Sequence, residues 1–270
     1  MSRSPVFTYR MKPAGSFCVG LKLDALTPFS PFRESVLQVP QDGPCGEAGD
    51  LLRMKPLVKS PFLAWPNSVQ LRHALGRILG VALCFGLIFG AAEWITEHRI
   101  ARVSIAMEWE RRIPFLPGFT LIYISAYAVL FPLAPWVLRT KREIDALAGQ
   151  SIVIILLAGL GFLLIPADLA YPPPEALGGW GPLFALADTL NLDHNLVPSL
   201  HVALSTMCVE HYAVQLSTSG RWALRAWGVL IAVSTLLLHQ HHVFDVLAGY
   251  ALALGVWNYG QRRLRHSLSK

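Results

Sequence analysis

The sequence predicts an all-α fold: a polytopic membrane protein built as a bundle of six transmembrane helices. Hydrophobic residues make up 53% of the 270 residues and charged residues only 15%, with a mean hydropathy of +0.45. Soluble domains are far less apolar. Six stretches approach the roughly 20 mostly apolar residues that a helix needs to cross a bilayer. Lysines and arginines stand in short clusters beside these stretches, so the net charge of +6 does not indicate a nucleic-acid partner.

The first three spans are predicted over residues 75–95, 119–138 and 147–165. The first contains Arg77 near its inner end, where a long side chain can reach the interface. The second carries Pro132 and Pro135, and we expect it to kink or stop there because proline cannot continue a regular helix. The third is an almost uninterrupted apolar run.

The last three spans are predicted over residues 198–216, 222–238 and 242–257. Hydropathy alone ranks the fourth span low, because it contains His201, Glu210 and His211. Polar groups are costly at membrane depth, so each is a functional candidate unless a structural partner explains it. We expect Glu210 and His211 to reach a neighbouring helix or the inner interface.

The orientation follows from the cations in the short loops. Four clusters fall on one side of six spans: before the first span, between the second and third, between the fourth and fifth, and after the sixth. The opposite loop 167–197 has four acidic residues and no lysine or arginine, whereas the loop 97–116 is mixed. Both termini are therefore predicted to be cytoplasmic and loop 167–197 external.

Three segments organise the chain. Residues 1–70 are rich in proline, lack the apolar core of a signal peptide, and are expected to form a mostly disordered cytoplasmic arm. Residues 71–260 form the membrane domain. Residues 261–270 form a basic cytoplasmic tail expected to contact anionic lipid. The four cysteines have no repeated spacing and are expected to be free thiols: Cys18, Cys45, Cys84 and Cys208.

Three titratable residues are expected to meet at the outer face. His201 lies in the first turn of the fourth span, and His241 lies in the short turn before the sixth. Asp245 follows His241 by four residues, a spacing that places both on one helix face. Pro198 is expected in the first turn of the fourth span. The free amides of that turn, with the Ser199 hydroxyl, are then suited to hold an anion beside His201.

These residues form two motifs, Pro-Ser-Leu-His and a more distal Ser-Thr…His-x-x-x-Asp that continues to a glycine. The pair resembles the second and third signature motifs of the type-2 phosphatidic acid phosphatase superfamily. The leucine and the glycine are more similar to the branch containing fungal inositol phosphorylceramide synthases and related bacterial proteins. The resemblance covers about residues 113–249. The motif residues are Pro198, Ser199, Leu200, His201, Ser234, Thr235, His241, Asp245 and Gly249.

The resemblance implies a role for each residue. His241 would be the nucleophile that forms a phosphohistidine, and Asp245 would orient and support its imidazole. His201 would be the general acid and then the general base. Ser199 and Leu200 would hold the phosphate of a lipid substrate. No metal or other cofactor is implied, and the site would face the periplasm from a bacterial inner membrane.

One signature is missing. The superfamily's first motif supplies a Lys and an Arg that hold the phosphate, but residues 165–174 contain no cation. Arg111, Arg112 or a protonated His194 are candidates to supply that charge.

Several alternatives remain open. Hydrolysis is favoured because the sequence shows no site for an alcohol acceptor, but a headgroup transferase resembling inositol phosphorylceramide synthase is an alternative. The chain could also be a catalytically silent transporter or binding protein. His239 and His242 are expected to have no chemical role, although together with His241 they could bind zinc or copper. Asp245 could instead pair with an outer arginine. The sequence does not predict the oligomeric state.

Overall fold

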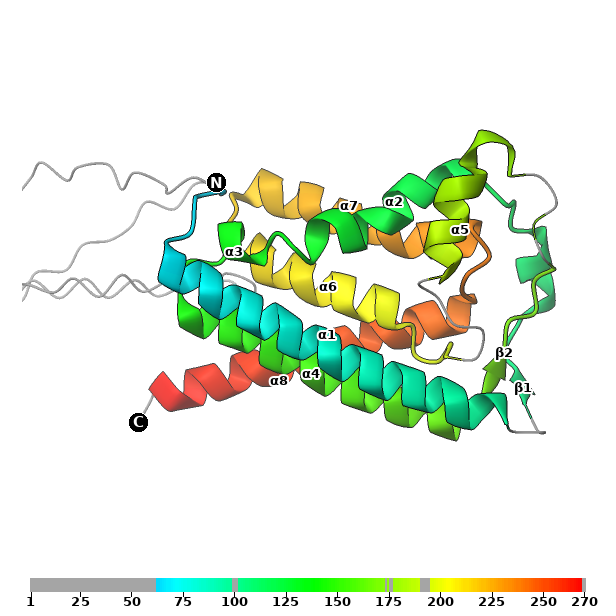
Figure 1. The fold of residues 1–270 in the computed structure, drawn as a ribbon, viewed down its shortest axis with the longest axis horizontal. Helices are drawn as coiled ribbons and strands as arrows, with labels where there is room; N and C mark the ends of the chain where they lie inside the picture. The colour runs from blue at the N-terminus through cyan, green and yellow to red at the C-terminus, as the bar shows by residue number, and fades with distance from the viewer. Residues whose placement is uncertain (1–61, 99–101, 173, 175–176, 190–194, 269–270) are drawn as a thin grey trace, which may run out of the picture. The chain divides into compact units, whose positions relative to one another are not determined.

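The computed structural model describes residues 62–98, 102–172, 174, 177–189 and 195–268. These residues belong to one unit, Arg53–Lys270, and are mostly helical, which confirms the all-α class (Figure 1). Most of the predicted arm lies outside the described residues. The main helices are α1 (Ser68–Glu97), α2 (Thr120–Ser125), α3 (Ala134–Val137), α4 (Lys141–Leu164), α5 (Gly181–Thr189), α6 (Leu200–Ala213), α7 (Thr218–Leu237) and α8 (Val243–Leu268).

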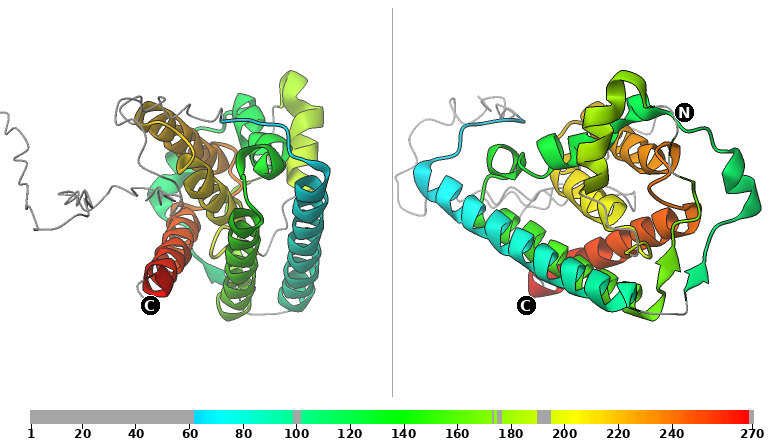
Figure 2. Two further views of the ribbon diagram at one scale, coloured as in Figure 1. Left: turned by 90° about the vertical axis from the view of Figure 1, so that its left-hand side faces the viewer. Right: turned by 45° about the vertical axis from the view of Figure 1, so that its right-hand side comes forward.

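Each predicted span coincides with helical structure. The first, third, fifth and sixth correspond to α1, α4, α7 and α8, and the fourth to α6. Among the described helices, α1 and α4 are long and apolar enough to cross a membrane, which is a weak indication of membrane association. These two helices pack side by side (Figures 1 and 2).

The second predicted span is broken, as its prolines indicated. After α2 the chain forms a π-helical turn, η3 (Ala126–Leu130), and resumes as α3 only after three further residues. Pro132 lies in this break and Pro135 lies in the first turn of α3. Single π-turns inside helices often occur at functional sites. The Tyr212 hydroxyl of α6 donates to the Leu130 carbonyl at 2.9 Å, which satisfies one backbone group of the turn.

Helix α6 is the centre of the fold. All fourteen of its residues are buried, and it packs against α4, α7 and α8 (Figure 1). Arg225 of α7 donates to both carboxylate oxygens of Glu210 at 2.9 and 2.7 Å. The His211 ring lies 3.1 Å from the Gln150 side chain of α4. Both residues therefore reach neighbouring helices, as predicted.

The outward faces of α1 and α4 are apolar. Leu79 and Leu87 of α1 are 60% and 72% exposed, and Leu160 and Leu164 of α4 are 53% and 70% exposed. These leucines recur at multiples of four, so they form one stripe on each helix. Exposed apolar stripes of this extent are typical of surfaces that meet a membrane or another protein.

Two features of the loops 97–116 and 167–197 were not predicted. Helix α5 forms within loop 167–197, where Phe184 and Ala187 bury their side chains in a cluster with Tyr123 and Leu238. Two short strands, β1 (Val103–Ser104) and β2 (Ala167–Asp168), pair in parallel and tie the two loops together. In addition, α8 continues to Leu268, past the predicted end of the sixth span at residue 257.

Candidate active site

The turn between α7 and α8 sets the position of His241. His239 follows the end of α7 with a φ of +54°, the left-handed conformation that commonly ends a helix. The Gln240 amide then donates to the Thr235 carbonyl at 2.9 Å and the His239 amide to that of Leu236 at 3.1 Å. These two bonds form a Schellman motif, which reverses the chain within a few residues.

His241 and Asp245 form a buried pair. Nδ1 of His241 lies 2.8 Å from Oδ2 of Asp245, and the two side chains are 2% and 0% exposed. The Val246 amide donates to the other carboxylate oxygen at 2.9 Å. Asp245 therefore pairs with a histidine and not with an arginine. The two residues four positions apart lie side by side, as the sequence predicted. When Asp245 is ionised, its Oδ2 accepts a hydrogen bond from the N–H at Nδ1 of His241. The lone pair of the neutral His241 ring then lies on Nε2.

His201 lies in the first turn of α6 and is 5% exposed. Its Nδ1 lies 3.0 Å from the Tyr127 hydroxyl of the π-helical turn, and its ring stacks on Tyr123 with centroids 4.0 Å apart. Its Nε2 is buried and has no hydrogen-bond partner among the described residues. Tyr127 and Tyr123 were not identified from the sequence, because nothing distinguished them from other aromatic residues of an apolar span.

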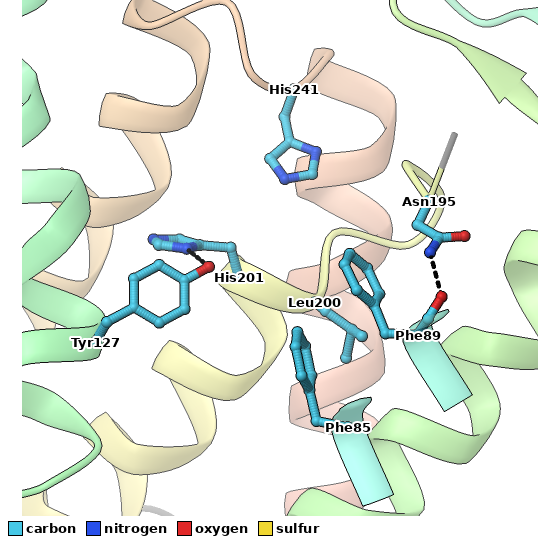
Figure 3. Close-up of a pocket in the computed structure, with 7 residues that line it drawn as sticks. All are labelled: Phe85, Phe89, Tyr127, Asn195, Leu200, His201 and His241. Carbon is cyan, nitrogen blue, oxygen red and sulfur yellow. Dashed lines mark hydrogen bonds between the residues drawn. The ribbon is translucent and has the colours of Figure 1, made fainter. Parts of the chain in front are cut away.

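His201 and His241 line the same small cavity (Figure 3). In Figure 3 the ring of His241 points down toward the level of His201, which is turned toward Tyr127. The cavity volume is about 10 Å³, close to the minimum that one water molecule needs. A phosphate group is larger than water, so it can enter only if lining side chains move. The lining residues are Phe85, Phe89, Tyr127, Asn195, Leu200, His201 and His241.

Of the predicted phosphate ligands Ser199 and Leu200, only Leu200 lines the cavity. Ser199 is fully buried and its hydroxyl accepts from the Val202 amide at 3.3 Å as the N-cap of α6. Pro198 therefore precedes the cap instead of lying in the first turn. Ser199 is not among the residues that line the cavity, and its hydroxyl is satisfied locally by capping its own helix. The amides of Leu200 and His201 donate to no described group.

Two glycines explain how the Pro-Ser-Leu-His segment is held. A Cβ on Gly249 of α8 would collide with the Ser199 carbonyl oxygen. A Cβ on Gly161 of α4 would lie 2.8 Å from the Val197 carbonyl oxygen and 2.7 Å from Pro198. The Ser199 amide donates to the Asp245 carbonyl at 3.0 Å. The segment is thus enclosed between two helices, and the distal motif needs glycine where α8 meets it.

The candidate cations stay outside the cavity. Arg111 and Arg112 are exposed on η1 (Glu108–Arg112), and neither lines the cavity. His194 lies outside the described residues. Among the described lining residues, no lysine or arginine is present.

The neighbouring histidines have separate partners. His239 Nε2 lies 3.0 Å from the Ile113 carbonyl oxygen, and His242, only 1% exposed, lies 2.6 Å from Glu110. Tyr171 stacks on both rings, with centroids 4.1 and 4.7 Å away. Burial, with the nearby charges of Glu110 and Asp245, raises the pKa of Tyr171 to about 12.

These separate partners do not favour a shared metal. Within the described part of the chain, no group of three or more His, Cys, Asp or Glu side chains is placed to hold a metal ion. Glu110 was missed by sequence reasoning. The available signal was its position in a mixed-charge loop that the predicted topology places on the same face as the candidate histidines.

No protein-family model matches this chain, and a search of solved structures finds no significant match.

Proposed function

We propose that this chain is a six-span membrane enzyme that removes phosphate from a lipid phosphate at the non-cytoplasmic face, through a phosphohistidine on His241. One observation carries the proposal: His241 is paired with buried Asp245 through Nδ1 and lines one cavity with His201. A nucleophile, the carboxylate that orients it and a second titratable group are the parts that nucleophilic catalysis requires.

The proposed first step forms the phosphoenzyme. The Nε2 lone pair of His241 attacks phosphorus, the bond from phosphorus to the lipid oxygen breaks, and protonated His201 gives its proton to that oxygen. The phosphorylated ring carries positive charge, which the carboxylate of Asp245 stabilises at 2.8 Å. The lipid alcohol then leaves, and His201 is neutral.

The second step is hydrolysis. A water oxygen attacks phosphorus, His201 takes a proton from that water, and the bond from phosphorus to Nε2 breaks. Inorganic phosphate leaves, His241 regains its lone pair, and His201 is again protonated. With a phosphodiester substrate, the headgroup phosphate stays on Nε2 of His241 after the lipid alcohol leaves. An acceptor alcohol then replaces water: its oxygen attacks phosphorus, His201 takes its proton and the bond from phosphorus to Nε2 breaks, which makes the enzyme a headgroup transferase.

The proposed membrane arrangement follows the cation clusters and the exposed leucines of α1 and α4. In this arrangement α6, with its titratable side chains, is shielded from lipid by its neighbours, because all of its residues are buried. Both termini are cytoplasmic, and the His241 turn faces outward.

The test is a screen of the purified protein in detergent against a panel of phospholipids and lipid phosphates, with released phosphate and new lipids measured. We expect phosphate release that vanadate inhibits and an acid-labile phosphoenzyme that His241→Gln lacks. Transfer of a labelled headgroup to an added alcohol, without phosphate release, would identify a transferase. An absence of both products and of phosphoenzyme would contradict the proposal and favour a transporter or binding protein.

A further inference from the structure

A second histidine–carboxylate pair adjoins the first. Glu110 of η1 is 1% exposed, although it lies more than 130 residues from α8 in the sequence. One carboxylate oxygen lies 2.6 Å from Nδ1 of His242, and the other accepts the Val243 amide at 3.0 Å. Val243 is the first residue of α8. Glu110 therefore holds the start of α8 at two points.

The hydrogen bonds determine the proton positions in this pair. The Ala170 amide donates to Nε2 of His242 at 3.2 Å, so that nitrogen carries the lone pair. A neutral imidazole then has its proton on Nδ1, which donates to Glu110. Each carboxylate oxygen of Glu110 therefore accepts one hydrogen bond. Its negative charge lies at the N-terminus of α8, where the helix dipole favours an anion.

The two pairs differ at Nε2. His242 uses its Nε2 to accept from Ala170, whereas no described residue bonds to Nε2 of His241, which lines the cavity. The second pair is therefore unsuited to attack phosphorus. Its position suggests another role, because His241 is joined directly to His242 and shares the backbone that Glu110 holds.

We propose that Glu110 is a positioning residue, which fixes the turn that carries His241 by holding His242 and Val243. This inference assumes the proposed function, in which His241 is the nucleophile. Without the two bonds, the start of α8 can shift, and His241 moves relative to Asp245 and the cavity. A displacement of a catalytic group by about 1 Å can lower turnover by about 10²-fold.

The decisive variant is Glu110→Gln, because glutamine has one oxygen and cannot accept from both donors. Its matched control is Glu108→Gln, which removes the same charge from an exposed position in the same short helix. We expect Glu110→Gln to lower kcat and the rate of phosphoenzyme formation by about 10- to 100-fold with KM nearly unchanged. The control is expected to match the wild type.

Two variants of His242 keep the inference testable if Glu110→Gln does not fold. His242→Asn retains a donor near the position of Nδ1 and should keep more activity than His242→Leu, which has none. In the His242→Leu background, Glu110→Gln should lower kcat by a smaller factor than it does alone, because one of the two bonds is already lost.

The outcomes separate the two proposals. An active wild type in which Glu110→Gln has the kcat of Glu108→Gln would overturn the positioning role and leave the nucleophile intact. Equal activity of His242→Asn and His242→Leu would also overturn it. A wild type that forms no phosphoenzyme would overturn the function itself, and the positioning role with it.

Discussion

Replacing Asp245 by Asn tests the proposed nucleophile directly, since the change removes one charge and leaves the side-chain size almost unchanged. Both carboxylate oxygens of Asp245 are occupied: one lies 2.8 Å from His241 Nδ1 and the other 2.9 Å from the Val246 amide nitrogen. Asparagine offers one oxygen and one NH₂ group, so one of these two contacts must change.

The consequence depends on which way the amide turns. If its NH₂ group faces His241, Nδ1 must accept, and the imidazole proton moves to Nε2, where it removes the nucleophilic lone pair. If the NH₂ group faces the Val246 amide, two donors meet in a buried site at a cost of about 1–3 kcal/mol. The first arrangement is favoured because it keeps both hydrogen bonds.

We therefore expect kcat to fall by about 10⁴-fold, as the corresponding change does in a serine protease triad, where it also selects the wrong tautomer. This corresponds to about 5 kcal/mol of transition-state stabilisation. The assay is single-turnover phosphate release with trapping of the phosphoenzyme, and folding is checked by monodisperse elution and thermal unfolding. Asp168→Asn, half-exposed and paired with Arg102, is the control and should be fully active. A folded Asp245→Asn enzyme within about tenfold of the wild type would refute the reasoning.

Four further predictions concern the rest of the site. Gly249→Ala should destabilise the protein by about 1–3 kcal/mol through the collision with Ser199, whereas Gly255→Ala in the same helix has open space and should not; equal thermal stabilities would contradict the close approach. If Arg111 or Arg112 compensates phosphate charge, its Ala variant should raise KM and lower turnover in steady-state assays, and two unchanged variants would discard that role. His241→Gln should form no phosphoenzyme, whereas His239→Gln and His242→Gln should still form it; equal loss in all three, with activity restored by zinc, would favour a metal site. In a cysteine-free background, Gly179→Cys should react with an impermeant thiol reagent in intact cells and Ser219→Cys should not; the reverse pattern would exclude an outer-face site.

The helices could be predicted because their signal is local. Each long apolar run became a helix, and the prolines of the second span marked its break. Helix α5 was missed because it is short and depends on a distant contact: Phe184 is buried in a cluster with Tyr123 and Leu238, from two other elements. No pattern within nine residues contains that information.

In the candidate site, too, contacts between residues close in the sequence could be predicted, and contacts between distant residues could not. The pairing of His241 with Asp245 joins residues four positions apart, one in the turn before α8 and one in its first turn, and the sequence shows that spacing directly. The contact of Glu110 with His242 joins residues 132 positions apart, and the contact of Tyr127 with His201 depends on a π-helical turn. Ser199 was expected at the phosphate, but its hydroxyl caps α6, because the nearest unpaired amide belongs to its own helix.

In the proposed membrane arrangement, the complete burial of α6 has a consequence for how the chain is assembled in a bilayer. An ionised side chain such as Glu210 is costly in hydrocarbon, so α6 alone is a poor candidate to leave a translocation channel for lipid. Its partner Arg225 lies on the very next helix, and the two side chains make paired hydrogen bonds. Insertion of α6 and α7 as one hairpin would bring the opposite charges into lipid together. Closure of α4 and α8 around α6 would then be a later folding step inside the membrane.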